Sequence, residues 1–466
     1  MESFIHIGVI LITLTATIHS LRPPSCTDAS HTCEAPTRTH FTVLYAGITL
    51  VAVGIGGTRF TTATMGANQF NKPKDQDTFF NWYFFTMYVS AVAASIGIVY
   101  VQDNVGWGLG FALCAAANAV AVAIFVLGRR YYRRNVPKGS PFVGLARVVI
   151  ASVRKRMEGL STDGKDYYHG DRCSLGKLAS MAPPSQSFSF FNHAALKTEG
   201  DTYSDEIIAK PWRLCTVEQV EDLKTIIRIL PVWSTAIFIS VPIGIQSSLT
   251  ILQALSMDRH VGPHFSIPAA SFLVFVILST AIFLPLVDRI IFPLWRRIRG
   301  SYPTPLQRVG IGHILNILGM AMSAVVESRR LHVVKTHNLA DHPSSRAPMS
   351  ALWLVFPLAL VGAGEAFHFP GGVAFYYQEF PASLRSTATA MTALIIAMGF
   401  YLSTAVVDLI RRVTRWLPDN INEARIDNVY WTMAVVGVVN FGYFLLCAKL
   451  YKYKNVRKEE RISIST

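Results

Sequence analysis

The first residues that could do chemistry are ionisable side chains inside long apolar stretches. Arg59 follows a glycine-rich segment (54–57) near the end of one stretch, and Glu365 lies deep in another. A charge at the centre of a membrane helix costs about 2.5 to 3.5 kcal/mol on insertion scales, so each is a candidate for function. A guanidinium keeps its charge and can offer a planar oxyanion two parallel hydrogen bonds. The alternative for Arg59 is a side chain that reaches the headgroup water.

Glu365 and His368 together are candidates for proton handling. Burial favours the neutral form of a carboxyl group, as a proton relay requires. His368 stands three residues later, shares a helical face with Glu365 and could share the proton. A negative substrate and the Glu365 carboxylate repel each other unless a proton neutralises one of them, which predicts proton coupling. The alternative is that both side chains are only hydrogen-bonded to neighbouring helices.

Gln246 and Ser247 are candidate neutral donors to an anion. They follow a Pro-Ile-Gly segment (242–244), where we expect the helix to be interrupted and backbone groups to be freed. The sequence therefore predicts a binding cavity near the midplane that holds Arg59, Gln246 and Glu365, with Ser247 beside them.

The elements that must position these residues are membrane helices. The chain has 466 residues, 51% of them hydrophobic and 15% charged, and a net charge of +14. A soluble domain usually carries about 25% charged residues, so a basic membrane protein without a nucleic-acid partner is expected. About ten stretches are long enough to span a bilayer. Their predicted limits are Phe4 to Leu21, Phe41 to Thr62, Phe79 to Val101, Trp107 to Leu127, Ile226 to Leu252, Phe265 to Val287, Leu306 to Val326, Ser350 to Gln378, Ser386 to Ile410 and Val429 to Cys447.

A long basic interval divides these stretches. The predicted parts are an incomplete N-terminal helix bundle (1–127), a cytoplasmic basic linker (128–225), a C-terminal six-helix bundle (226–448) and a cytoplasmic tail (449–466). The positive-inside rule places linker and tail in the cytoplasm, although Arg329 and Arg330 then fall outside. Within the linker, Phe142 to Met157 predicts either a basic helix on the inner leaflet or a solvated linker helix. The Ser-rich segment Pro183 to Phe191 is predicted to be mobile.

Several motifs occur in an order that resembles one transporter family. They are the segments 79–85 (FFNWYFF), 230–233 (LPVW), 305–312 (PLQRVGIG) and 364–367 (GEAF). The sequence resembles the plant nitrate and peptide transporter family, which belongs to the proton-coupled oligopeptide transporters of the major facilitator superfamily. The segments 56–61 (GGTRFT), 245–250 (IQSSLT) and 365–370 (EAFHFP) are closest to the nitrate excretion subgroup.

The resemblance implies an all-α, polytopic fold with about 10 of the family's 12 transmembrane helices, because the chain aligns from the third helix onward. We expect either a truncated gene model or a real short form. Arg59 stands where the family has a Lys that pairs with an acidic motif of the first helix. The family position of Glu365 is linked to substrate or proton handling. The resemblance also implies a gating contact in an inside loop at Asp288 and Arg289, and bend or packing points at Pro370 and Gly371.

The expected function is transport of nitrate or a similar small anion across the plasma membrane by alternating access, either proton-coupled or of efflux type. One alternative is a transport-incompetent, truncated or regulatory membrane protein, and another is the same fold carrying peptides, hormones or other organic anions. The oligomeric state is open. No enzymatic activity, cofactor or metal is expected, because the sequence has no phosphate-binding loop, paired metal-ligand His or nucleophile elbow. The aromatic residues at 376, 377 and 79–85 are expected to form interfacial belts.

Overall fold

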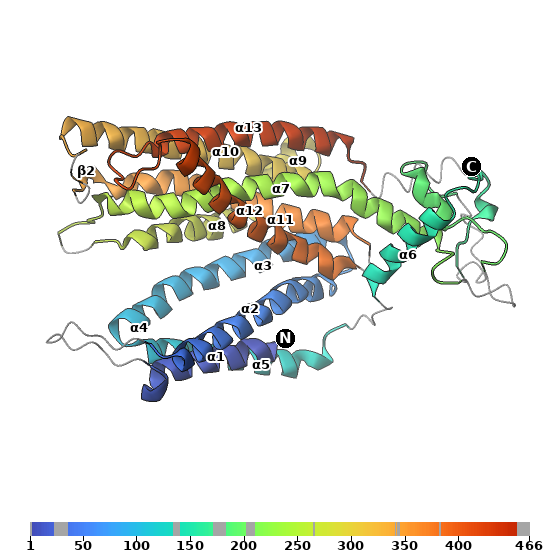
Figure 1. Ribbon diagram of the computed structural model, residues 1–466, viewed down its shortest axis with the longest axis horizontal. Helices are drawn as coiled ribbons and strands as arrows, with labels where there is room; N and C mark the ends of the chain where they lie inside the picture. The colour runs from blue at the N-terminus through green and yellow to red at the C-terminus, as the bar shows by residue number, and fades with distance from the viewer. Residues whose placement is uncertain are drawn as a thin grey trace. The chain divides into compact units, whose positions relative to one another are not determined.

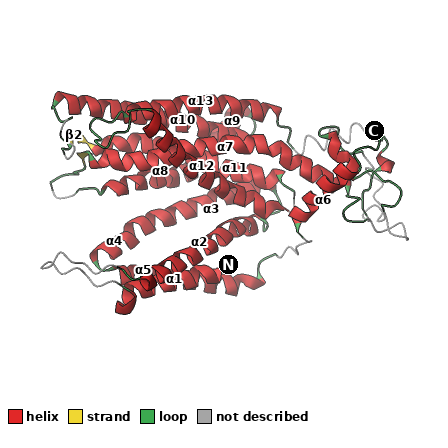
Figure 2. Ribbon diagram, in the orientation of Figure 1, coloured by secondary structure: helices red, strands yellow, loops and turns green. Residues whose placement is uncertain are grey.

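The computed structural model describes residues 2–22, 36–133, 140–170, 183–201, 210–263, 266–340, 342, 345–381 and 384–453. Regular structure in these ranges is almost entirely helical (Figure 2). Nine helices of the described ranges are long and apolar enough to cross a membrane, which confirms the predicted polytopic all-α class. The first predicted span is shorter than expected, because helix α1, Glu2–Thr17, ends before Ile18. Arg22 is extended, as a residue before a proline prefers.

The chain forms two compact units. The first contains Met1–Arg134, Pro242–Ala374 and Ser403–Val435. In this unit α1 packs side by side with α2 and α5, and α3 packs against α8 (Figure 1). The helices here are α2 (Arg38–Ala67), α3 (Pro73–Ala93), α4 (Val99–Asn104), α5 (Trp107–Leu127), α8 (Val274–Leu286), α9 (Phe292–Arg299), α10 (Pro305–Thr336) and most of α11 (Val355–Glu379). Two short parallel strands, β1 (Met257–Asp258) and β2 (Ala347–Ser350), join its loops.

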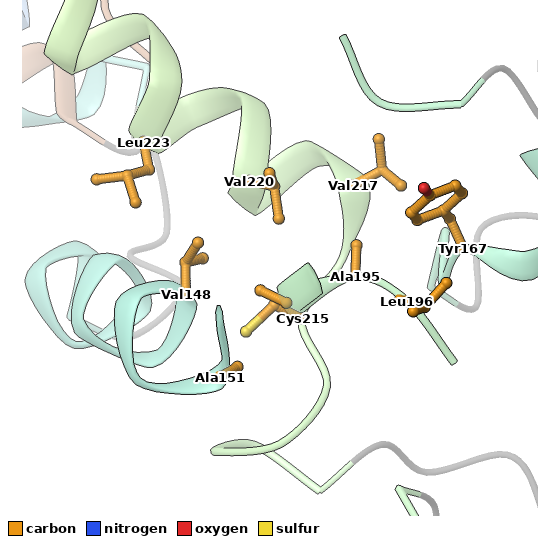
Figure 3. Packing of buried hydrophobic residues seen from close by; sticks show 10 residues of the cluster. Val148, Ala151, Tyr167, Ala195, Leu196, Cys215, Val217, Val220 and Leu223 are labelled. Atoms are coloured by element: carbon orange, nitrogen blue, oxygen red, sulfur yellow. The ribbon is translucent and has the colours of Figure 1, made fainter. Parts of the chain in front are cut away.

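The second unit contains Asn135–Val241, Phe375–Leu402 and Val436–Thr466. It holds α6 (Pro141–Arg154), the 3₁₀ helix Ser189–Ala194, the first part of α7 (Val217–Leu255), most of α12 (Arg385–Val413) and the end of α13 (Ile426–Leu450). Figure 3 shows Val148 of α6 facing Cys215 and Leu223 in a buried apolar cluster. The part of the basic linker that the structure describes therefore has a small hydrophobic core, built with the start of α7, which we call the linker core.

The segment 183–191 was predicted to be mobile, and this prediction is wrong. The Ser185 hydroxyl donates to Glu221 Oε1 over 2.8 Å, and the buried Lys224 ammonium donates to the Ser185 carbonyl over 2.7 Å. Asn192, in the 3₁₀ helix, accepts from the same ammonium over 2.5 Å. A Ser-rich composition concealed this order, because the partners of the segment come from α7.

The expected interruption at 242–244 is also absent, since α7 is helical without a break from Val217 to Leu255. A proline removes only one backbone donor, and in a membrane helix neighbouring groups compensate for it. The Ser247 hydroxyl donates to the Gly244 carbonyl over 2.8 Å, within the same helix. The predicted aromatic belt is wrong for four residues that are buried inside the protein, namely Phe80, Phe84, Tyr376 and Tyr377.

Candidate functional site

Glu365 lies at a point where α3, α8 and α11 meet within the first unit. Its side chain is buried, with 8% of the residue exposed. The Tyr88 hydroxyl of α3 donates to Glu365 Oε2 over 2.9 Å. The Thr280 hydroxyl of α8 lies 3.5 Å from the same oxygen and donates to the Gly362 carbonyl over 3.0 Å. The Tyr88 hydroxyl is therefore the close donor to this carboxylate oxygen, and the Thr280 hydroxyl, whose single hydrogen is directed to a backbone carbonyl, lies nearby.

Glycines bring the helices close enough for these contacts. A Cβ atom on Gly362 of α11 would lie 2.5 Å from the Val276 carbonyl oxygen of α8. A Cβ atom on Gly312 of α10 would lie 2.7 Å from the Cβ atom of His368. Any side chain at these two positions would push the helices apart, since real Cβ atoms do not approach other atoms so closely. Small residues are how membrane helices achieve such packing.

His368 faces a second histidine, His313 of α10, which the sequence reasoning missed. The two rings meet edge to face with centroids 5.5 Å apart, and both residues are buried. His368 Nδ1 has no hydrogen-bond partner among the described residues. His313 comes eight residues after the start of α10, in the PLQRVGIG segment, so its position in an apolar helix was a readable signal.

One face of α3 carries further polar contacts. Asp77 Oδ2 accepts from Arg308 Nη2 of α10 over 3.2 Å, and this pair is largely buried. Asn81 Nδ2 donates to Asp288 Oδ1 over 3.1 Å. Residues 77, 81 and 88 lie on one face of the helix, at intervals of one and two turns. We call Asp77, Asn81 and Tyr88 the α3 polar face.

Asp288 and Arg289 were expected in a loop, and this expectation is wrong. They lie in the π-helical turn Val287–Ile291, which joins α8 to α9 without a break in helical structure. Arg289 is exposed, its Nε atom is 3.8 Å from Asp288 Oδ2, and its guanidinium lies 5.4 Å from the centre of the Trp82 ring of α3. The contact that fixes Asp288 is therefore Asn81 rather than Arg289.

Pro370 and Gly371 lie inside α11, which remains helical to Glu379. A Cβ atom on Gly371 would lie 2.9 Å from Arg308 Cβ and 3.2 Å from the Pro305 carbonyl oxygen. Gly371 is thus a close-packing position beside the Arg308 side chain that meets the α3 polar face.

Gln246 lies at another level of the first unit. It is buried, and its Nε2 atom donates to Ser323 Oγ of α10 over 3.0 Å. His368 meets α10 at His313, and residues 313 and 323 of a helix are about 15 Å apart along its axis. Glu365 and His368 thus lie one turn apart on α11, whereas Gln246 and Ser247 lie apart from them.

Arg59 lies within α2, whose last residue is Ala67, so its backbone is well inside the helix. Its side chain lies outside the described part of the structure. Of the glycines before it, Gly54 packs directly against Ile5 of α1, whereas Gly56 has open space where a side chain would stand. The glycine-rich segment therefore allows a close helix approach at Gly54, and α2 continues through the segment without a break.

A second buried polar network was missed by sequence reasoning. Arg330 is fully buried and donates to both carboxylate oxygens of Glu327, over 2.7 and 2.9 Å. Gln253 Nε2 donates to Glu327 Oε2 over 2.7 Å, and the Tyr430 hydroxyl donates to Gln253 Oε1 over 3.0 Å. Arg330 Nη1 also donates to Asn422 Oδ1 over 3.1 Å. The network joins α7, α10 and α13 within the first unit.

Comparison with known proteins identifies the class. A family model described as "PTR2: POT family" matches residues 1–423. The chain is 50% identical over 462 residues to Protein NRT1/ PTR FAMILY 2.6 of Arabidopsis thaliana, across 99% of this chain and 81% of that protein. It is 52% identical over 454 residues to Protein NRT1/ PTR FAMILY 2.7 of the same plant, across 97% and 79% of the two chains.

Solved structures agree on the fold. The chain resembles an auto-inhibited POT family peptide transporter with a TM-score of 0.61 at 17% identity, covering 97% of this chain and 81% of the other. The POT family transporter PepTSo gives a TM-score of 0.57 at 18% identity, covering 96% and 82%. The fold is therefore that of a multi-pass membrane transporter of the major facilitator type. The chain belongs to the POT family, and within it to the NRT1/PTR transporters.

Proposed function

We propose that this chain carries nitrate or a similar small anion across the membrane together with protons, and that Glu365 is the proton-coupling residue. The observation that carries the proposal is the hydrogen bond between Tyr88 and the buried Glu365 carboxylate. This bond connects a carboxyl group that can take up a proton with the place where α3, α8 and α11 contact each other. A proton on Glu365 changes the charge at a place where the helices must move relative to each other.

A proton on Glu365 would remove the charge repulsion that opposes binding of an anion. A carboxylate and a negative substrate repel each other in a medium of low dielectric constant. Protonation of Glu365 removes this repulsion, so proton and anion favour each other's binding. His368 on the same helix and His313 on α10 offer imidazole rings as further proton carriers.

The α3 polar face supplies a gate. Alternating access requires the N-terminal helices, within 1–127, to rock against the C-terminal helices, within 226–448. Asp77, Asn81 and Tyr88 of α3 contact Arg308, Asp288 and Glu365, so these contacts must be broken when α3 moves away. Gly371 lies beside Arg308 and allows the close packing of the same gate, and Pro370 precedes it in α11.

Nitrate is proposed on the resemblance of the segments 56–61, 245–250 and 365–370 to the nitrate excretion subgroup. Arg59 is the proposed cationic contact for the anion, with Gln246 and Ser247 as neutral donors at a separate level. Arg59→Ala should abolish anion flux without loss of membrane insertion. Arg59→Lys is the matched control, since it keeps the charge but lacks the planar fork.

The test is flux into proteoliposomes that contain the purified chain. Labelled nitrate, chloride and a dipeptide are compared under counterflow, and nitrate uptake is then measured across a pH series with and without a pH gradient. Nitrate flux that rises with an inward proton gradient supports the proposal. If only the dipeptide is transported, the substrate is a peptide rather than nitrate. Absence of flux for all three, with correct insertion, would favour a transport-incompetent or regulatory protein. The plasma membrane is the proposed location, which a fluorescent fusion in plant cells tests.

A further inference from the structure

Helix α6 exposes a continuous apolar stripe. Residues 142, 146, 149 and 153 recur at helical spacing, and residues 143 and 150 lie beside them on the same side of the helix. All six are apolar and exposed, among them Phe142 at 61% and Val153 at 47%. A solvated linker helix would carry polar residues there. The stripe consists of Phe142, Val143, Ala146, Val149, Ile150 and Val153.

The opposite side of α6 is already occupied, so the stripe cannot turn inward. Val148 and Ala151 are fully buried against Cys215, Val220 and other residues of the linker core (Figure 3). Lys155, directly after the helix, is also buried, and its ammonium donates to the Leu196 carbonyl over 2.6 Å. These contacts fix the rotation of α6 about its axis and keep the stripe on the outer surface of the linker core.

The linker core also fixes where α6 lies along α7. Val220 and Leu223 of α7 belong to the same buried cluster as Val148, and Ile227 packs against it. The apolar stretch of α7 begins at Ile226, which is about 5 Å beyond Leu223 along a helix. The chain is a multi-pass membrane transporter, so the contact places α6 within about two helical turns of the membrane boundary.

Basic and aromatic side chains border the stripe. Arg154 and Arg156 are exposed, and Arg147 lies about two helical turns before Arg154. The Arg147 guanidinium lies 5.6 Å from the centre of the Trp212 ring, and Arg154 Nη1 donates to the Trp212 carbonyl over 3.3 Å. An exposed Trp beside arginines is typical of the interface between headgroups and water.

We propose that the exposed stripe of α6 lies in the headgroup region of an anionic phospholipid surface, with Arg154 and Arg156 bound to lipid phosphates. Three observations carry this proposal together: the unpaired apolar stripe, the charge beside it and the contact with α7 at the membrane boundary. An apolar face with a basic border is how a helix lies in the plane of a membrane interface. The α6 contact would then anchor the linker core to the leaflet where α7 begins.

The test measures the depth of α6 in full-length protein in lipid bilayers. A ketone-bearing amino acid replaces Ile150 or Val153, and a nitroxide attached to it reports collisions with oxygen, which concentrates in lipid, and with a water-soluble nickel complex. Lys197 is exposed in the same unit and serves as the control position. We expect the two stripe labels to collide several-fold more with oxygen than with nickel, relative to the label at position 197.

Two results would overturn the proposal. Stripe labels with the same nickel accessibility as position 197 would show that the stripe faces water. Stripe labels shielded from both reagents would show that protein, such as a second copy of this chain, covers it. The charge contribution is tested by combining Arg154→Gln with Arg156→Gln in bilayers with and without phosphatidylglycerol. We expect the variant to lose depth in the anionic bilayer, and unchanged depth there would refute the role of the arginines.

Discussion

Tyr88 and Glu365 are separated by 277 residues in the chain, and the Tyr88 hydroxyl donates to Glu365 Oε2 over 2.9 Å. The bond joins α3 to α11 at the place where Thr280 of α8 also approaches the carboxylate. A hydrogen bond to a charged group is worth about 1.5 to 3 kcal/mol, more than a neutral one. The protonation state of one buried side chain can therefore bias whether three helices stay together.

The first prediction concerns this bond. Glu365→Gln keeps an oxygen that accepts from Tyr88 but cannot bind a proton at neutral pH. We expect this variant to lose proton-driven accumulation of substrate while it keeps counterflow, which needs no net proton movement. Tyr88→Phe keeps the carboxyl group and removes the donor, so accumulation should persist at a changed rate. Uptake into proteoliposomes with an imposed pH gradient measures both.

Thr280→Val is the matched control, because the Thr280 hydroxyl lies at the longer distance of 3.5 Å from Glu365 Oε2. Its effect should be smaller than that of Tyr88→Phe. Proton-driven accumulation by Glu365→Gln at the rate of the unchanged chain would show that the proton is carried elsewhere.

The second prediction concerns Asp77 and Arg308, whose side chains are 3.2 Å apart. Asp77→Arg places two positive charges at a largely buried contact and should stop transport. Loss of one partner of a buried pair costs about 3 to 5 kcal/mol because the other charge is left uncompensated. The double variant Asp77→Arg with Arg308→Asp restores opposite charges and should recover part of the rate.

Recovery in the double variant is the informative result, measured as substrate uptake at equal amounts of inserted protein. If the double variant loses as much activity as the two single variants lose together, the two residues are not coupled, because the effects of substitutions at independent sites add. Asp77→Asn serves as control, since it removes the charge without introducing a repulsion.

The sequence predicted the helical class and the buried Glu365 and His368 from hydropathy alone. It could not predict Tyr88, because a tyrosine in an aromatic segment carries no signal of its partner in another helix. His313 could have been singled out as an ionisable ring in an apolar helix, but its partner could not be predicted, since the contact with His368 depends on Gly312, which lets the two helices approach closely. Contacts between distant helices depend on packing, which residue spacing within one segment does not encode.

The ion pair of Arg330 with Glu327 could have been predicted from residue spacing. Arg330 was counted as an outer charge that departs from the positive-inside rule, whereas its charge is compensated by Glu327, one helical turn earlier. An acidic and a basic residue three apart in an apolar helix were readable as a pair. The two interpretations of α6 were both incomplete, because only the linker core shows which of its faces is buried.

The third prediction is that Arg330→Met destabilises the protein. Glu327 would remain fully buried without its cation, at a cost of about 3 to 5 kcal/mol. The double variant Glu327→Gln with Arg330→Met removes both charges and should lose less. Arg329→Met is the matched control, because Arg329 is exposed and its guanidinium makes a cation-π contact, 5.5 Å from the centre of the Trp353 ring.

Thermal unfolding in detergent, followed by tryptophan fluorescence, checks the order. We expect the lowest Tm for Arg330→Met, an intermediate one for the double variant and a nearly unchanged one for Arg329→Met. A Tm of Arg330→Met equal to that of Arg329→Met would mean that the buried network does not stabilise the first unit.

The fourth prediction concerns the thiol of Cys215 in the linker core. Burial raises the pKa of Cys215 to about 11, although Lys155 and Arg147 act in the opposite direction. A raised pKa keeps the thiol protonated to higher pH, and only the thiolate reacts with alkylating reagents. At pH 8 about one thiol in a thousand is ionised at such a pKa, compared with about one in four at the ordinary value of about 8.5.

Alkylation by a maleimide, followed by mass spectrometry, tests this in a chain that keeps Cys215 and has serine at the other five cysteine positions. Lys197→Cys in the same background, with serine also at position 215, provides an exposed thiol on the same unit. We expect Cys215 to react at least a hundredfold more slowly than the thiol at 197 at pH 8, and to react at a similar rate once the protein is denatured. Equal rates in the folded protein would show that the linker core opens readily, and the fixed rotation of α6 that rests on this core would then be lost.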